Sequence, residues 1–430
     1  MSEAQQHVIP LSSAAAADAD RVGPKAANLA ALGRAGLPTP GGFCLSADAY
    51  RAQIAALGLQ DLVTRFGAAD PAERNRLSVE IRLGLYEQPI APVVLEPLMA
   101  AWQAQRATSG MPSAVRSSAL IEDREGANFA GQFESFLGIA DETAFLIAVR
   151  ACWAALWTSH ARRYMENHDL SPSDTAMAVL IQPLVDAHAS GGGLSATAEG
   201  QMLLSATWGL GSAIAQGEVV PDRITLSRQG FLRKNEPGRK DHRETCGHGD
   251  GAVPRAVPKD LVSKPCLDAG QAVALGRLLR KAEDVLGTEV EIEWALDDAG
   301  FKLLQARPLH LEPIVVPDRI WLQHPGLNGH PAGIGWGSGR AVVVNCECEL
   351  SRVAPGDVLV TKVAGPALSH VLPRVAGVVA ELGGSTSHLA SLARERGIPM
   401  VLGVLDATQR IPDGSQVAVD GVAGVVRWMR

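Results

Sequence analysis

Four prolines within about twenty residues divide this chain into two parts. They are Pro313, Pro317, Pro325 and Pro331. Their segment has little hydrophobic periodicity, whereas regular patterns continue on both sides of it. Because proline lacks a backbone N–H and fixes φ, such a segment interrupts helices and interior strands. We therefore expect a linker at 313–331 that joins one domain at 10–312 to a second domain at 332–430.

The composition is that of a globular protein without a nucleic-acid or membrane partner. With 430 residues, 47% hydrophobic and 20% charged, the chain can bury a large core and exceeds the usual size of one domain. Its 39 Lys+Arg against 46 Asp+Glu give a net charge of −7, and no basic block is present. No apolar run reaches the ~18 residues of a membrane span, and the N-terminus lacks a secretory-signal pattern. We therefore expect a cytoplasmic location.

The six cysteines are scattered along the chain, which favours reduced thiols over a disulfide framework. Two short clusters resemble parts of a zinc site. One contains His242, Cys246 and His248, and the other contains Cys346 and Cys348. Neither cluster has a complete four-ligand pattern, so a metal role is not favoured for them.

Hydrophobic periodicity predicts an α+β mixture up to residue 312. After a weakly ordered lead-in of about 25 residues, a helix is expected around residues 26–32. Further helical patterns lie at 139–167 and 268–287, and strand patterns lie at 113–120, 176–185, 289–296 and 301–306. Beyond the linker, strands are expected at 358–362, 376–382, 399–404 and 415–421, with a helix at 387–397.

A predicted hairpin at 289–309 groups four polar side chains. Side chains alternate along a strand, so Glu291 and Glu293 share one face of the first strand, and Gln305 and Arg307 share one face of the second. Carboxylates suit Mg²⁺, and a guanidinium suits phosphate oxygens. The same pattern also fits a cross-strand ion pair on a solvated face, so both interpretations stay open at this point.

A second segment has the features of a phosphate-binding loop. Arg116 ends an apolar strand, and the loop that follows contains Gly131 and the hydroxyl of Ser135. Small residues let backbone N–H groups approach phosphate oxygens. Lys25, just ahead of a helical pattern, would add a positive charge. An ordinary turn and a surface lysine are the alternatives.

His388 is expected in the first turn of a Ser/Thr-capped helix that follows Gly383 and Gly384. The positive end of the helix dipole disfavours an imidazolium there, so the ring stays neutral and nucleophilic. The N–H groups at the same end would stabilise an added phosphoryl group. This combination favours a phosphohistidine, with a purely structural polar residue as the alternative.

Five segments, in this order, resemble the signatures of the phosphoenolpyruvate synthase, pyruvate phosphate dikinase and rifampicin phosphotransferase group. They are GPKAANLAALGRAGLPTPGGFCLS, AVRSSALIED with NFAGQFESFLG, WGLGSAIAQGEVVPD, EIEWALDDAGFKLLQARPL and GGSTSHLASLARERGIPMVLGV. The match covers almost the whole chain. The resemblance implies an ATP-grasp-type nucleotide-binding domain at 10–312, followed by a smaller swivelling β/α domain at 332–430. That second domain resembles the mobile phosphohistidine domain of PEP-utilising enzymes.

The resemblance also implies residue roles. ATP phosphates would be held by a set of residues comprising Lys25, Arg116, Gly131, Ser135, Gln305 and Arg307. Gln182 would lie along the nucleotide, Glu291 and Glu293 would face Mg²⁺, and His388 would carry the phosphoryl group. The chain departs from the family pattern at three positions: Glu291 replaces a common Asp, Ser135 a frequent Thr, and Ser212 a Glu. The change at Ser212 removes a charge.

The activity implied is that of an ATP-dependent dikinase-type phosphotransferase. The β-phosphoryl group of ATP would pass to His388 through a pyrophosphoryl intermediate, with release of AMP and phosphate, and then to a small-molecule acceptor. About twenty residues between the domains leave no room for an acceptor-specific unit, so pyruvate and rifamycin are not the expected acceptors. The acceptor would bind at the domain interface or on a separate subunit, a layout similar to split phenylphosphate synthases.

Two alternatives to this activity remain. In the first, the protein is a phosphorelay or regulatory subunit that passes the His388 phosphoryl group to a partner protein. In the second, it is a degenerate nucleotide-binding module without transfer. The retained lysine, arginine, glutamate and histidine residues of the implied site argue against the second alternative.

Overall fold

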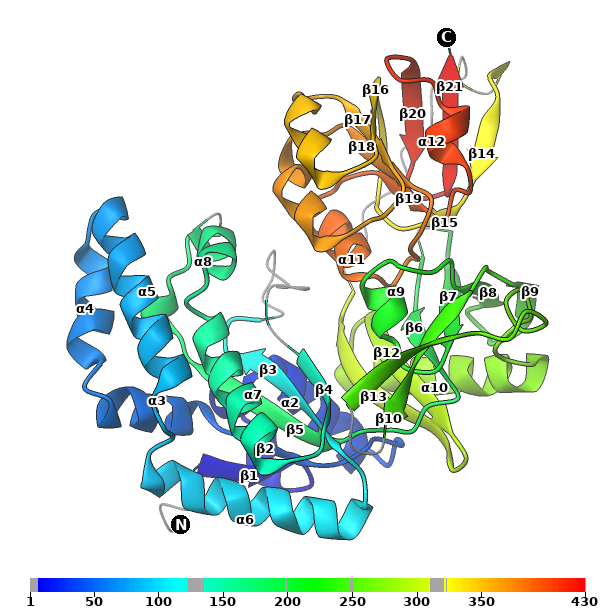
Figure 1. Ribbon diagram of the computed structural model, residues 1–430. Coiled ribbons are helices and arrows are strands. Elements are labelled where there is room, and N and C mark those ends of the chain that lie inside the picture. The colour runs from blue at the N-terminus through cyan, green and yellow to red at the C-terminus, as the bar shows by residue number, and fades with distance from the viewer. Residues whose placement is uncertain are drawn as a thin grey trace. The chain divides into compact units, whose positions relative to one another are not determined.

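The computed structural model describes residues 7–122, 133, 135–166, 168–197, 199–247, 251–309, 321 and 323–429. The chain forms two compact units (Figure 1). The first unit comprises Met1–Val185, Cys246–Val253 and Lys302–Arg307. The second unit comprises Asp186–Thr245, Pro254–Phe301 and Pro308–Arg430.

The first unit is built on a five-stranded antiparallel sheet. Its strands are β1 (Val8–Pro10), β2 (Phe43–Leu45), β3 (Ser113–Ala119), β4 (Ser135–Ile139) and β5 (Met177–Pro183). Their order is β1-β2-β5-β3-β4. The residues of β5 from Met177 to Ile181 are fully buried, which explains why this strand reads as a continuous apolar run in the sequence.

The helices of the first unit begin and end at recognisable signals. They are α2 (Ala19–Arg34), α3 (Ala47–Ala56), α4 (Gln60–Ala68), α5 (Pro71–Glu87), α6 (Pro92–Ser109), α7 (Glu142–Ala155) and α8 (Ser159–Glu166), with the 3-10 turns η1 (Ala14–Ala17) and η2 (Pro172–Asp174). Asp70 caps α5 by accepting from the Glu73 N–H at 2.9 Å, with Pro71 in the first turn. Gly110, at φ +66°, ends α6.

The second unit contains a six-stranded sheet. Its strands are β6 (Ala189–Leu194), β7 (Gln201–Trp208), β8 (Asp222–Ser227), β9 (Leu232–Glu236), β12 (Val290–Asp297) and β13 (Gly300–Pro308). Their order is β13-β12-β6-β7-β8-β9. Within β13, Lys302–Arg307 are assigned to the first unit. Helix α10 (Ala269–Leu286) packs on this sheet, and the short helix α9 (Ser212–Ala215) follows β7. Strands β10 (His242–Gly247) and β11 (Gly251–Ala256) form a separate two-stranded sheet.

The C-terminal part of the second unit is an eight-stranded mixed sheet. Its strands are β14 (Gly326–Asn328), β15 (His330–Pro331), β16 (Trp336–Val344), β17 (Val358–Thr361), β18 (Gly377–Ala380), β19 (Met400–Leu402), β20 (Gln416–Asp420) and β21 (Val425–Met429). Their order is β14-β21-β20-β16-β17-β18-β19-β15, with β16 to β19 parallel. The helices are α11 (His388–Glu395), α12 (Ala407–Arg410), η4 (Glu347–Arg352), η5 (Pro366–His370) and η6 (Leu372–Arg374).

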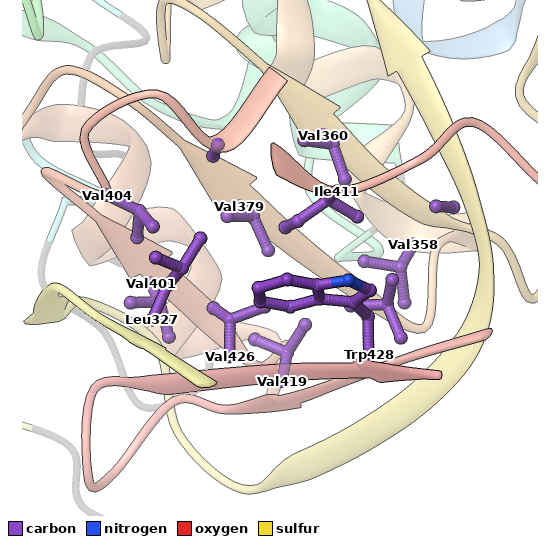
Figure 2. Packing of buried hydrophobic residues seen from close by; sticks show 13 residues of the cluster. Leu327, Val358, Val360, Val379, Val401, Val404, Ile411, Val419, Val426 and Trp428 are labelled. Carbon is purple, nitrogen blue, oxygen red and sulfur yellow. The ribbon is translucent and has the colours of Figure 1, made fainter. Parts of the chain in front are cut away.

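A valine-rich core holds this eight-stranded sheet together. Figure 2 shows the indole ring of Trp428 among Val358, Val419 and Val426. These three valines are fully buried, and Trp428 is 8% exposed. Because the core side chains come from parallel and antiparallel strands alike, the sheet behaves as one packing layer.

The predicted mixture of helices and strands is confirmed. The strand patterns at 113–120, 176–185, 289–296 and 301–306 correspond to β3, β5, β12 and β13, and the helical pattern at 268–287 corresponds to α10. The four strands predicted beyond the linker correspond to β17, β18, β19 and β20, and the predicted helix corresponds to α11. The boundaries 10–312, 313–331 and 332–430 remain predictions. Residues 310–320 and 322 lie outside the described part of the chain.

Three expectations are wrong in part. The lead-in is structured at residues 7–25, because Ile9, Leu11 and Ala16 are buried in a cluster with α2. The pattern at 139–167 is two helices, since the Thr158 hydroxyl accepts from the Ala161 N–H at 3.2 Å and begins α8. Cys346 and Cys348 form a disulfide, their Cα atoms being 5.3 Å apart.

Among the described residues, no helix is long and apolar enough to cross a membrane.

Candidate active site

His388 is the first residue of α11 and is exposed, whereas the next six residues of the helix are buried. The preceding residue, Ser387, caps the helix, because its hydroxyl accepts from the Ala390 N–H at 3.2 Å. Gly383, at φ +102°, turns the chain from β18 toward this cap. The imidazole therefore belongs to an exposed residue at the positive end of a short helix.

Lys25 lies directly after a kink in α2. Gly23 has φ +77° there, and any Cβ at this position would collide with Ser118. The Lys25 Nζ donates to the Ser117 carbonyl at 2.9 Å and lies 3.2 Å from a Glu122 carboxylate oxygen. The Glu122 side chain is only 3% exposed, so this ion pair is largely buried and costly to break. The ammonium is thus fixed beside β3.

Arg116, Ser135 and Gln182 share one face of the five-stranded sheet. Arg116 on β3 lies opposite Ser135 on β4, and Ala114 lies opposite Gln182 on β5. Directly paired residues point to the same side, and residues two positions apart on a strand do so as well. Gln182 is 2% exposed, and its Nε2 donates to the Gly41 carbonyl at 3.3 Å. Gly131 lies outside the described residues.

Gln305 and Arg307 lie on β13, in the segment that belongs to the first unit. The carbonyl of Ala306, the residue between them, accepts from the Asn28 side chain at 3.2 Å. Asn28 lies one turn after Lys25 on α2. The segment is also held by the Leu303 N–H, which donates to the Pro38 carbonyl at 2.8 Å. The structure therefore brings both residues next to the helix of Lys25.

Glu291 and Glu293 lie on β12 in the second unit and point to one face. Glu293 pairs with Gly192 of β6 across the sheet. Glu291 is buried, and one of its carboxylate oxygens accepts from Ser391 at 3.2 Å and from Arg394 at 2.9 Å. Ser391 follows His388 by three positions on α11, so it lies one turn away on the same side. The second unit therefore places the helix of His388 against a carboxylate of the hairpin.

Ser212, which stands where the family pattern has a glutamate, has a carboxylate as its neighbour. Its hydroxyl donates to Glu244 of β10, and the backbone of Leu210 pairs with that of Glu244 at 2.8 Å. A negative charge is therefore present beside Ser212, supplied by a different strand. A sequence reading could not find this replacement, because the two residues are 32 positions apart.

The zinc-like clusters gain no support from the described residues. His242 hydrogen-bonds to Asp241 and Glu218, which raises its pKa although burial opposes the rise. No group of three or more His, Cys, Asp or Glu side chains in the described part of the chain could hold a metal ion. His248 lies outside that part.

The sequence reading missed two charged partners of the candidate site residues. Glu122 follows β3 directly and pairs with Lys25. Arg394 lies six positions after His388 and contacts Glu291. No local signal marked the pair of Arg394 with Glu291, because the two residues are 103 positions apart and Arg394 lies on a different face of α11 from His388.

Two family models match the sequence. Residues 19–314 match the model described as "Pyruvate phosphate dikinase, AMP/ATP-binding domain", and residues 353–424 match "PEP-utilising enzyme, mobile domain". Among curated proteins, the chain is 32% identical to a probable phosphoenolpyruvate synthase of Methanothermobacter thermautotrophicus, with 95% of this chain and 61% of the relative aligned.

Two further relatives are also named phosphoenolpyruvate synthase. The protein of Aeropyrum pernix is 31% identical over 94% of this chain and 56% of its own length. The protein of Escherichia coli is 29% identical over 95% of this chain and 55% of its own length. The chain thus spans about 55 to 61% of the length of these relatives.

Proposed function

The chain belongs to the family of pyruvate phosphate dikinase and PEP-utilising enzymes, and we propose that it transfers a phosphoryl group from ATP to its own His388. The observation that carries this proposal is the contact of α11 with Glu291. His388 begins the helix whose later residues Ser391 and Arg394 contact Glu291, on the strand that also carries Glu293. In this proposal, 10–312 is an ATP-grasp-type nucleotide-binding domain and 332–430 is a swivelling phosphohistidine domain.

The first step is a displacement at the β-phosphorus of ATP. A ring nitrogen of His388 attacks this atom, and the bond between the β-phosphorus and the oxygen bridging it to the α-phosphorus breaks. AMP leaves with that oxygen and its electron pair, and His388 carries a pyrophosphoryl group. Water then attacks the terminal phosphorus and releases phosphate and a proton, which leaves the former β-phosphoryl group on His388.

The residues of the first unit would bind the triphosphate. Lys25, Arg116 and Arg307 supply positive charge for the phosphate oxygens, and Gln305 and Ser135 supply hydrogen bonds. Gly131 would let the phosphate loop approach closely, and Gln182 would lie along the nucleotide. Because phosphoryl transfer depends mainly on positioning and charge stabilisation, these residues would provide most of the rate enhancement.

The two carboxylates of β12 suit Mg²⁺. Proteins commonly hold this ion with one or two carboxylates plus phosphate oxygens. In the structure one oxygen of Glu291 accepts from Arg394, so an ion bound through that oxygen would displace the contact. Glu291 and Glu293 would hold the ion, which when bound neutralises charge on the phosphate oxygens. The negative charge of these carboxylates would otherwise repel the triphosphate.

We propose that the phosphoryl group then passes to a small molecule. The relatives are named phosphoenolpyruvate synthase, so pyruvate is the first acceptor to test. If isolated phosphoprotein is not dephosphorylated by pyruvate or other small molecules but is dephosphorylated by a partner protein, the relay function replaces the small-molecule function. If dephosphorylation needs both a partner protein and a small molecule, the partner is a separate acceptor subunit.

Uptake of label from ATP tests the proposal. With ATP labelled at the β-phosphorus and Mg²⁺, the protein should take up acid-labile, base-stable label and release AMP. His388→Ala should abolish uptake, whereas His188→Ala, at a histidine whose side chain is 57% exposed, should not. ADP as the sole product, or uptake by His388→Ala, would overturn the proposal.

A further inference from the structure

Arg394 makes a buried ion pair with Glu291 between two parts of the second unit. Arg394 lies on α11, and Glu291 lies on β12 of the six-stranded sheet. Their side chains are 5% and 7% exposed, and the N–O distance is 2.9 Å. A buried pair of this kind is strongly orienting, because removing one partner leaves an uncompensated charge. No reacting atom takes part in it.

Thr386, in the loop before α11, makes a second contact with the six-stranded sheet. Its hydroxyl lies 2.5 Å from the Ser205 hydroxyl on β7. Ser205 pairs with Gly192 of β6, and Gly192 pairs in turn with Glu293 of β12. Thr386 therefore lies over a row of paired residues that runs from Ser205 through Gly192 to Glu293.

Gly192 provides the space for Thr386. A Cβ at Gly192 would lie 2.5 Å from the Thr386 Cβ and Cγ2, closer than such atoms approach in real structures. The clash involves the Cβ of Thr386 and cannot be relieved by rotating the side chain alone.

The loop before α11 has further contacts with the segment before β8. Pro221 packs against Gly384, where a Cβ would also collide, and the Gly383 N–H donates to the Val219 carbonyl at 3.0 Å.

These contacts surround His388 in the sequence on both sides. Thr386 precedes it by two residues, and Arg394 follows it by six. Two fixed points on either side of a reactive group restrict both its position and its orientation, which is what an efficient displacement requires. Loss of either point would leave unchanged the candidate phosphate-binding residues of the first unit, which include Lys25, Arg116 and Arg307.

We propose that Arg394 and Gly192 are positioning residues for phosphoryl transfer to His388. Arg394 holds α11 on β12 through Glu291, and the missing side chain at Gly192 admits Thr386. The role in transfer rests on the proposed function. The docking role, which is to hold α11 and the loop before it on the six-stranded sheet, does not. The docking contacts are defined as Arg394–Glu291, Thr386–Ser205 and Thr386–Gly192.

A disulfide cross-link measures docking without catalysis. In the full chain with Ser205→Cys and Thr386→Cys, the two sulfurs should come within bonding reach, since the native hydroxyl oxygens are 2.5 Å apart. After mild oxidation, peptide mass mapping should find the linked pair. Adding Arg394→Met or Gly192→Ala should slow its formation at least fivefold.

Matched controls are available in the same part of the chain. Arg340→Met breaks the ion pair between the exposed side chain of Arg340 and the buried side chain of Asp357, and Gly365→Ala adds a methyl group where no atom of another part of the chain lies within 4 Å. Neither should change the cross-linking rate. A cross-linking rate in both test variants equal to that of the controls would overturn the docking role.

The transfer step is measured separately. Single-turnover labelling of His388 from β-labelled ATP should slow at least tenfold in Arg394→Met and Gly192→Ala. ATP affinity is measured by equilibrium dialysis without Mg²⁺, because Arg394 contacts the proposed metal ligand Glu291, and it should stay within twofold. Arg394→Lys should recover part of the rate. Unchanged labelling, or equal losses of labelling and ATP affinity, would overturn the positioning role.

The design separates the possible failures. Arg394 also donates to the Ser385 and Ala332 carbonyls, so Arg394→Met can lower the melting temperature of the protein. In that case Gly192→Ala decides the result, because its strand keeps all backbone partners. If the unmodified protein takes up no label, the proposed function fails, and the cross-linking result still confirms or overturns the docking role.

Discussion

At the scale of single residues, His330 couples stability to pH. It is buried on β15, and desolvation together with the charge of Arg223 lowers its pKa to about 3. An unfolded histidine titrates near 6.5, so the unfolded state binds more protons between these two values. The stability that neutral His330 contributes is therefore fully present above pH 6.5 and is lost as the pH falls toward 3.

The size of this effect can be measured by urea unfolding. Between pH 7 and pH 5 the protein should lose about 2 kcal/mol of unfolding free energy through His330. His330→Gln removes the titrating group, so its stability should fall by about 2 kcal/mol less over the same interval. Equal losses for both proteins would contradict the burial of a neutral histidine.

Ser212 and Glu244 form a second residue-scale test. Ser212→Glu would place two carboxylates in contact and should destabilise the protein by between about 1 and 4 kcal/mol at pH 7. Adding Glu244→Gln should restore most of the loss, and this double-mutant cycle is read from urea midpoints. If the double variant is no more stable than Ser212→Glu alone, Glu244 is not the source of the charge.

Residues were predictable where a local pattern carries the chemistry. His388, for example, follows two glycines and a capping serine, and its place at the start of α11 is confirmed. Arg394 was not predictable, because its partner Glu291 lies 103 positions away and nothing local marks the pair. The roles of the predicted site residues stay predictions until the labelling experiments are done.

At the scale of elements, the cap of α11 links local structure to reactivity. Ser387→Ala removes the acceptor for the Ala390 N–H and should cost about 1 kcal/mol. It should also slow labelling of His388, because the first turn that presents the imidazole frays. Both effects are measured on one preparation, by thermal unfolding and by single-turnover labelling.

The matched control is the cap of α10. Asp268 accepts from the Gln271 N–H at 2.8 Å, so Asp268→Ala should lower stability by a similar amount. Labelling should then stay at the wild-type rate. Equal slowing in both variants would mean that general stability, and not the first turn of α11, limits the reaction.

Helices and strands with a regular pattern of apolar side chains were predictable, whereas a glycine-rich strand was not. Strands β17 to β20 are short apolar runs between turn residues, and all four are confirmed. Strand β6 contains Gly191, Gly192 and Gly193, so it lacks the alternation that marks a strand. At Gly191 the missing side chain is needed because a Cβ would collide with the Ser205 carbonyl of β7. That requirement exists only in the folded sheet.

At the scale of the whole molecule, family membership was predictable because five motifs occur in order along the chain. Long-range pairing was not, since it depends on contacts between distant segments. In the proposed reaction, the three phosphates of ATP are divided among three products. AMP takes the α-phosphate, His388 takes the β-phosphate, and free phosphate takes the γ-phosphate.

The most direct measurement is a single turnover with Mg²⁺ and ATP labelled in turn at each phosphorus. The proposed reaction should give α label in AMP, β label on the protein and γ label in free phosphate, in equal amounts. Appearance of the α and β labels together in ADP, with only γ label on the protein or in phosphate, would contradict it.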